Sequence, residues 1–151
     1  MENMTPYVLM IGLGAHAIFE GIALGMGKSV EKVLLLALAI LMHKGAAGMS
    51  LGSSMAKAFP DRDNHVIMLL FMFAIFTPLG IAIGWAADQD SPLTEIIFSC
   101  LAAGTFIYIA CSEVIIEEFS SPQNKWFKFI FYIMGIAFIA SLKFVEPEDD
   151  D

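Results

Sequence analysis

The sequence predicts an all-α membrane protein, a five-helix transmembrane bundle formed by a single domain over residues 1–151. Hydrophobic residues make up 58% of the 151 positions and charged residues only 16%, and the mean hydropathy is +0.73. A soluble domain is close to half apolar and a quarter charged. The apolar excess comes in blocks of about 20 residues, the length that an α-helix needs to cross the hydrocarbon core of a bilayer.

Five such blocks occur, and the short polar connections between them require successive helices to run antiparallel. The third block contains no charged residue and is the clearest span. The fifth is short and rich in aromatic residues, and Lys128 lies near enough to its end for the ammonium to reach the membrane surface. In chain order the predicted spans are 4–27, 33–56, 66–87, 94–119 and 126–143, and residues 144–151 form an acidic tail.

Ionisable side chains inside the spans are the first candidates for function. Such a group costs a few kcal/mol to insert into a bilayer, so it is expected to face protein or water rather than lipid. Five of them lie well inside the predicted spans: His16 and Glu20 in the first, His43 and Lys44 in the second, and Glu113 in the fourth.

His16 and Glu20 are four residues apart, so both side chains leave the same face of the first helix. An imidazole and a carboxylate one turn apart suit zinc, iron, manganese and similar ions. The alternative is a hydrogen bond between the two side chains that serves only helix packing.

The second span repeats the pattern, with His43 near its middle and Lys44 beside it. A row of small residues follows over 45–48, and the first span carries its own row of glycines. Small residues let helix backbones approach closely. We expect these two rows to pack together, bringing His43 toward His16 and Glu20; the alternative is that the glycines serve packing alone.

A buried lysine needs a partner for its charge. A neighbouring metal-ligating carboxylate such as Glu20 could supply the negative charge, and the ammonium would then fill electrostatically a place where a second cation could bind. The alternative is that the side chain extends to the membrane surface, but Lys44 lies close to the middle of its span.

Four motifs in order resemble those of the ZIP (ZRT/IRT-like) metal transporters. Residues 16–25, HAIFEGIALG, resemble the family's fourth-helix signature, and residues 43–52, HKGAAGMSLG, resemble the fifth. Residues 77–81, TPLGI, resemble a sixth-helix motif, and residues 104–118, GTFIYIACSEVIIEE, resemble the seventh helix. Together they extend across nearly the whole chain, and they are far more specific than an isolated HxxxE.

The resemblance implies transport of zinc, or of Fe²⁺, Mn²⁺ or Cd²⁺, toward the cytosol, with His16, Glu20 and His43 as metal ligands. Many family members complete a second metal site with a carboxylate one turn after the histidine of the fifth helix. Ala47 stands there in this chain, and Lys44 follows the histidine, which suggests a single transported metal. Glu113 would be a carboxylate of the pathway or of helix packing.

A complete ZIP protein has eight helices, and this chain resembles the last five. It is therefore expected to form homo-oligomers or to associate with the missing N-terminal helices. The alternative function is a truncated, non-transporting membrane module that associates with a full-length transporter.

Other classes of function find little support in the sequence. The net charge is −8, and the eight basic residues are spread along the chain, so no nucleic-acid partner is expected. The water-activating HExxH motif is absent, and no enzymatic activity or resident cofactor is expected. The first span is not preceded by a positive segment, so it is not expected to be a signal peptide. The expected partners are a divalent metal ion and the lipid bilayer, in a multi-pass protein of the plasma membrane or an organelle.

Overall fold

The computed structural model describes residues 4–87, 92–120 and 123–142, without the side chains of a few positions within these ranges. Its contacts divide the chain into two compact units, Met1–Ile109 and Ala110–Asp151, which are described in turn. That the chain forms a single transmembrane domain stays a prediction.

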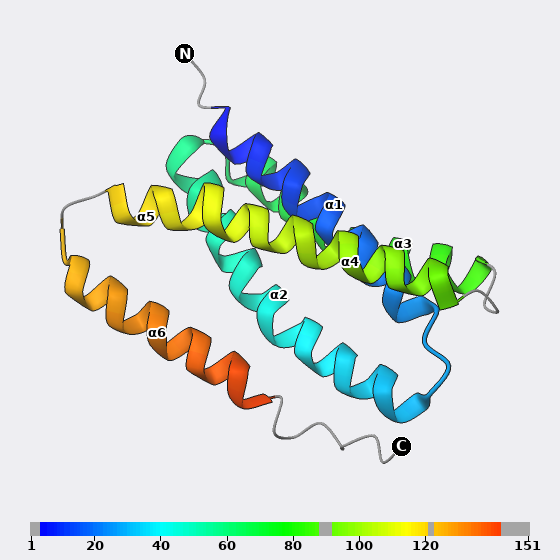
Figure 1. Cartoon of the computed structure of the whole chain (residues 1–151). Helices are drawn as coiled ribbons and strands as arrows, with labels where there is room; N and C mark the ends of the chain where they lie inside the picture. The colour runs from blue at the N-terminus through cyan, green and yellow to red at the C-terminus, as the bar shows by residue number, and fades with distance from the viewer. Residues whose placement is uncertain (1–3, 88–91, 121–122, 143–151) are drawn as a thin grey trace. The chain divides into compact units, whose positions relative to one another are not determined.

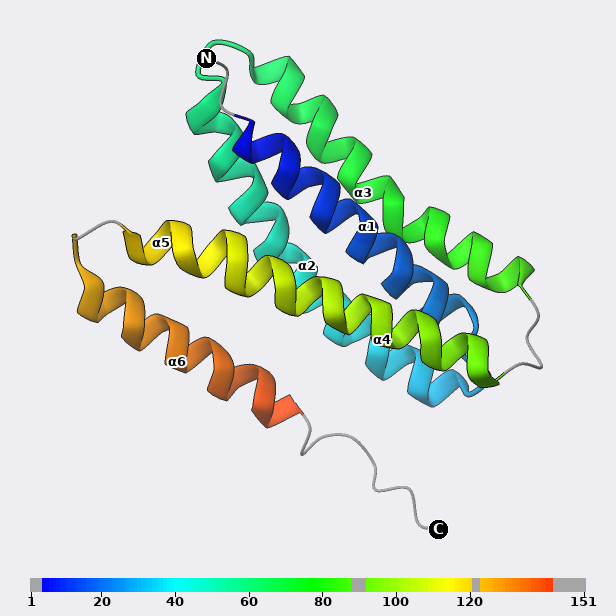
Figure 2. The same cartoon turned by 45° about the horizontal axis from the view of Figure 1, so that its top comes forward.

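The first unit consists of four helices that run in alternating directions, as their short connections require (Figures 1 and 2). α1 lies among the other three and contacts each of them. Of the apolar 18-residue stretch of α1, 56% is buried inside the structure, against 6% for the corresponding stretches of α2 and α4. The helix that carries two of the predicted site residues is thus the central element of this unit. The four helices are α1 (Thr5–Gly25), α2 (Val30–Ala58), α3 (Asp63–Ala86) and α4 (Pro92–Ile109).

The closest packing is between α1 and α3, because glycines on both helices remove the side chains that would separate their backbones. A Cβ atom added to Gly21 would lie 2.5 Å from the carbonyl oxygen of Thr77 and 3.0 Å from the Cα of Gly80. The expected packing of the glycines of α1 against the small residues of α2 is therefore wrong. A Cβ on Gly45 or Gly48 of α2 would meet nothing within 4 Å. α3 takes that place because it has glycines of its own where it meets α1.

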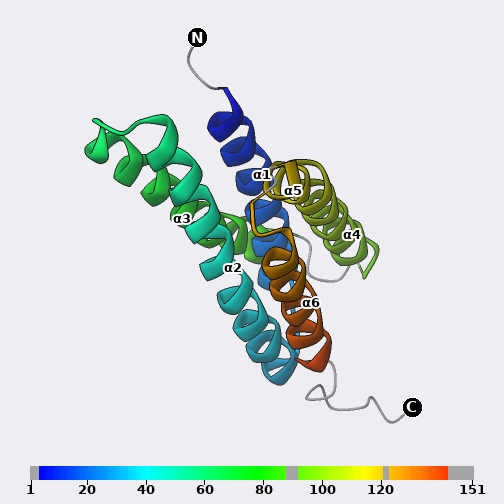
Figure 3. The same ribbon diagram turned by 90° about the vertical axis from the view of Figure 1, so that its left-hand side faces the viewer.

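The helix ends follow local chemistry. A proline in the first turn starts α1, where its missing N–H has no partner to lose. α2 has Glu31 in its first turn and Lys57 in its last, each opposite in sign to the adjacent end of the helix dipole. A short turn then leads into α3, which begins at Asp63 (Figure 3). Pro78 lies inside α3, next to its contact with α1, where a neighbouring helix makes a proline tolerable.

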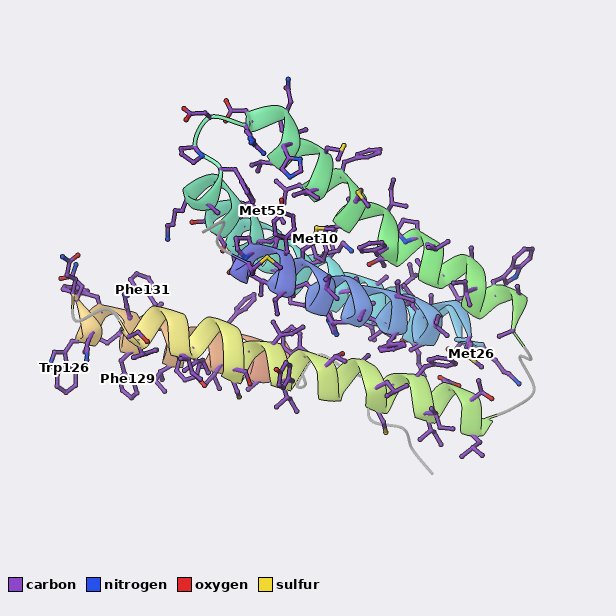
Figure 4. All side chains as sticks on the ribbon, turned by 90° about the horizontal axis from the view of Figure 1, so that it is seen from above. Met10, Met26, Met55, Trp126, Phe129 and Phe131 are labelled. Carbon is purple, nitrogen blue, oxygen red and sulfur yellow. The ribbon has the colours of Figure 1, made fainter. Side chains whose placement is uncertain are left out.

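The core of the first unit is formed by aliphatic side chains and methionines. Met26 and Met55, labelled in Figure 4, are among the largest fully buried side chains. At the end where α1 begins, the Tyr7 hydroxyl lies 3.2 Å from Nε2 of His65, and both rings pack against Phe59. These contacts fix the α2–α3 turn to the first helix.

The second unit contains a π-helix, η1 (Ala110–Ile115), then α5 (Ile116–Ser120) and α6 (Lys125–Leu142). Asn124 precedes α6 with a φ of 56°, a left-handed conformation that asparagine tolerates. Phe119 and Tyr132 pack edge to face, with ring centroids 6.3 Å apart. Trp126, Phe129 and Phe131 project from the surface of α6 (Figure 4).

The all-α class and the multi-pass character are confirmed. Among the described residues, four helices are long and apolar enough to cross a membrane, and they correspond to the first four predicted spans. α2 begins at Val30, three residues before the predicted 33–56, and ends at Ala58. α6 lies at the fifth predicted span, 126–143. Residues 88–91 before α4, residue 143 and the acidic tail 144–151 lie outside the described residues.

The fourth predicted span differs from the structure in one respect. Residues 94–119 were expected to form one regular helix, but η1 separates α4 from α5. π-helical turns are found frequently at functional sites, and they have no distinctive composition by which hydropathy could reveal them.

Candidate metal site

Three of the predicted residues come together between α1 and α2. His16 and Glu20 extend from the same face of α1, one turn apart, and His43 reaches them from α2. One potential ligand atom from each residue lies within 4.8 Å of the other two. Oε1 of Glu20 is 2.8 Å from Nε2 of His43 and 3.8 Å from Nε2 of His16, so the carboxylate stands between the imidazoles.

The three side chains are largely shielded. Their exposed fractions are 9% for His16, 12% for Glu20 and 22% for His43. Nε2 of His16 and Nε2 of His43 are buried and make no hydrogen bond to any described residue. The close approach of His43 to Glu20 is an ion-pair contact by distance, but it lacks the geometry of a hydrogen bond. Two buried imidazole nitrogens that face one carboxylate without a hydrogen bond are uncommon, and a bound ion would satisfy both of them.

The arrangement fits a small divalent cation. Zinc binds imidazole nitrogen and carboxylate oxygen at about 2.0–2.2 Å, which places the ligands of a tetrahedral ion roughly 3.4 Å apart. The distances of 2.8 and 3.8 Å bracket that value, so small side-chain movements suffice to receive the ion. Three protein ligands leave at least one coordination position for water or for a passing ligand.

α4 fixes the orientation of His16. Nδ1 of His16 lies 3.0 Å from the backbone carbonyl oxygen of Ala102, and because a carbonyl only accepts, Nδ1 must carry the proton in this hydrogen bond. The lone pair of Nε2 then faces Glu20 and His43. Metal-binding histidines are commonly held in this way by a hydrogen bond from their other ring nitrogen.

An aromatic ring closes one side of the cluster. The centroid of Phe106, on α4, lies 5.0 Å from the ring of His16 and 5.4 Å from that of His43. Phenylalanine offers no ligand atom, so this side restricts access without adding to the coordination. An apolar wall of this kind limits water and lowers the local dielectric around a metal site.

Lys44 makes its direct contacts with α3. Its ammonium donates a hydrogen bond to the hydroxyl of Thr77 on α3 and lies 4.7 Å from the centroid of Phe73. Among the described side chains, no carboxylate, Glu20 included, is within ion-pair distance of it. The lysine therefore contacts α3. It lies beside the metal cluster but forms no ion pair with the carboxylate of Glu20.

The remaining candidate is Glu113, which belongs to η1 and whose side chain lies outside the described residues. Sequence reasoning missed three participants: Phe106, the carbonyl of Ala102, and the hydroxyl of Thr77. Thr77 had a usable signal, because a hydroxyl beside a proline in an otherwise apolar span is unusual. Phe106 is one of thirteen phenylalanines, and a backbone carbonyl leaves no trace in the sequence.

Nearly the whole chain is similar in sequence to known proteins. Residues 2–143 match the family profile described as ZIP zinc transporter. The chain is 34% identical to zinc transporter ZIP1 of Danio rerio over 148 residues, which are 95% of this chain and 49% of the relative. It is 34% identical to zinc transporter ZIP1 of Homo sapiens over 92% of this chain and 44% of the relative. Its identity to zinc transporter ZIP3 of Homo sapiens is 30%, over 91% of this chain and 45% of the relative.

The chain thus spans about half the length of the curated relatives it matches. No solved structure matches it.

Proposed function

Because the chain belongs to the ZIP zinc transporter family, we propose that it takes part in moving divalent cations, zinc first, across a membrane toward the cytosol. In this proposal His16, Glu20 and His43 bind the ion in transit. Metal here is the substrate and not a resident cofactor, and Fe²⁺, Mn²⁺ and Cd²⁺ are the other candidate substrates because the same ligand types accept them.

One observation carries the proposal. Two imidazole nitrogens and a carboxylate oxygen lie within 4.8 Å of one another, on two helices that are long and apolar enough to cross a membrane. Such groups are costly to insert into a bilayer, so their presence in these helices points to a function. A metal pathway gives all three a common role.

The ligand set also suits transport better than storage. A site on a transport pathway must bind the ion tightly enough to accept it and loosely enough to release it. Three ligands of mixed type hold zinc less completely than the closed four-ligand sites that stabilise folds. Movement of α1 and α2 relative to other helices would expose the site to one side of the membrane and then the other. Lys44 and Glu113 are proposed to support the pathway electrostatically.

The experiment is uptake of radioactive zinc by cells that express the chain, with surface or organellar insertion measured in the same cells. Glu20→Ala is expected to abolish uptake while insertion is retained. Glu95→Ala removes an exposed carboxylate from the first turn of α4, outside the site, and is the matched control that should transport normally. Undiminished uptake by Glu20→Ala would refute the site.

A second candidate function is a membrane module that associates with a full-length transporter and carries no flux of its own. A correctly inserted chain with no zinc uptake, which nevertheless co-purifies with a co-expressed full-length relative, would support that alternative over independent transport. A chain that transports zinc without the relative would exclude it.

A further inference from the structure

The hydroxyl of Thr77 joins three helices beside the metal cluster. It accepts a hydrogen bond from the Lys44 ammonium of α2 and donates one to the backbone carbonyl of Ala17 on α1, at 3.4 Å. Thr77 itself belongs to α3 and is buried, with 7% of its surface exposed. Ala17 follows His16 directly, so this hydrogen-bonded chain ends next to a proposed ligand.

Lys44 is the immediate neighbour of His43, whose Nε2 is in contact with Glu20. A lysine side chain is long and has several rotatable bonds, so an ammonium at this position has two possible directions. One leads to the Glu20 carboxylate. The other leads to Thr77 and the face of Phe73, and that is the direction observed.

The two directions have opposite consequences for a cation. An ammonium paired with Glu20 would neutralise the carboxylate and repel an incoming metal ion at close range, in surroundings where charges are poorly screened. An ammonium held on Thr77 makes no ion pair with Glu20, so this carboxylate stays with the two histidines of the cluster. The ammonium nitrogen also lies 4.7 Å from the centroid of the Phe73 ring, which attracts a cation without offering a competing negative charge.

We propose that Thr77 is a positioning residue that sets the metal affinity of the site by holding Lys44 away from Glu20. This inference rests on the proposed function, since it assumes that Glu20 is a ligand. Without the Thr77 hydroxyl, the ammonium loses its acceptor and turns toward the carboxylate of Glu20. Lys44 then competes with the metal for that carboxylate.

The test is a set of zinc affinities measured by chelator competition on the whole chain in lipid nanodiscs. Thr77→Val keeps the shape of the side chain and removes the hydroxyl, and it should raise the dissociation constant for zinc at least about fivefold, the lower end of measured couplings between sites. Thr77→Ser keeps the hydroxyl and should restore the wild-type affinity. In a Lys44→Met background, Thr77→Val should have no further effect, because the competing ammonium is gone.

A general packing defect would weaken binding in both backgrounds, so equal losses with Lys44 and with Met at position 44 would overturn the inference. Wild-type affinity in Thr77→Val would also overturn it. If Thr77→Val does not fold, Thr77→Ala makes the same comparison. Glu20→Ala is measured in parallel: zinc binding that does not depend on Glu20 would refute the proposed function itself, whereas a Glu20-dependent site that ignores Thr77 refutes only the role of Thr77.

Discussion

His16 donates a hydrogen bond from Nδ1 to the carbonyl oxygen of Ala102, 86 residues further along the chain, at 3.0 Å. A side chain on α1 is thereby oriented by the backbone of α4. The hydroxyl of Thr105 also lies within hydrogen-bond distance of two backbone carbonyl oxygens of α4, that of Ala102 at 3.0 Å and that of Leu101 at 2.8 Å. Three helices consequently shape the cluster: α1 and α2 carry the proposed ligands, and α4 fixes the tautomer of the more buried histidine.

The first prediction concerns this histidine. His16→Ala removes one of the two imidazoles of the cluster and should weaken zinc binding by about tenfold or more, because even outer-shell partners of metal ligands contribute 10- to 100-fold. His65→Ala also removes an imidazole, but one that contacts Tyr7 at the end of the bundle. Zinc affinity measured by chelator competition should fall only in the first variant. Equal losses in both would argue for general damage and against a ligand role.

The second prediction concerns the apolar wall. Phe106→Ala should open the side of the cluster that faces α4, admitting water as additional ligands. Ions that require six ligands, such as Mn²⁺, should gain most, whereas zinc accepts four. When zinc and manganese compete for uptake, we expect the preference for zinc to be smaller in Phe106→Ala than in the wild-type chain. Phe106→Leu should retain the wild-type preference. An unchanged preference in Phe106→Ala would show that the ring has no influence on selectivity.

Hydropathy was sufficient to predict the class of the fold and the places of its helices, because a bilayer imposes both the length and the composition of each span. Helical periodicity was sufficient to place His16 and Glu20 on one face. The choice of packing partners was not predictable in the same way. Small residues occur on α1, α2 and α3, and only the three-dimensional arrangement shows that Gly21 meets Gly80, whereas a Cβ on Gly45 would meet none of the described residues within 4 Å.

The hydrogen-bond acceptor of Lys44 could not be predicted from the sequence for a related reason. Charge complementarity favours Glu20, but the ammonium hydrogen-bonds to Thr77, which is 33 residues away and uncharged. Sequence spacing does not reveal which polar groups of different helices meet. It likewise gives no sign of η1, because a π-helical turn has no distinctive composition in an apolar span.

The third prediction tests the α1–α3 packing. A Cβ atom on Gly84 would lie 2.9 Å from the Cα of Ile22, against a backbone that cannot move aside as a side chain can. Gly84→Ala should therefore destabilise the chain by about 1–3 kcal/mol, the usual cost of overpacking. Gly45→Ala meets nothing within 4 Å and should be neutral or stabilising by up to about 1 kcal/mol through helix propensity.

Unfolding of the two alanine variants in detergent, followed by circular dichroism, makes this comparison directly. Both substitutions are identical in chemistry and both lie in helices, so lipid or detergent effects largely cancel. Equal stability of the two variants would contradict the close backbone contact between α1 and α3.

The fourth prediction links metal binding to stability. A ligand that binds only the folded state stabilises it by about 2.7 kcal/mol at a free concentration of 100 times its dissociation constant. Zinc should therefore raise the unfolding temperature of the wild-type chain, and a chelator should reverse the change. The effect should vanish in Glu20→Ala, which removes the carboxylate that stands between the two imidazoles, and persist in Glu95→Ala and His65→Ala. Zinc-dependent stabilisation of Glu20→Ala would place the binding site elsewhere, since no other described residues cluster as three potential metal ligands.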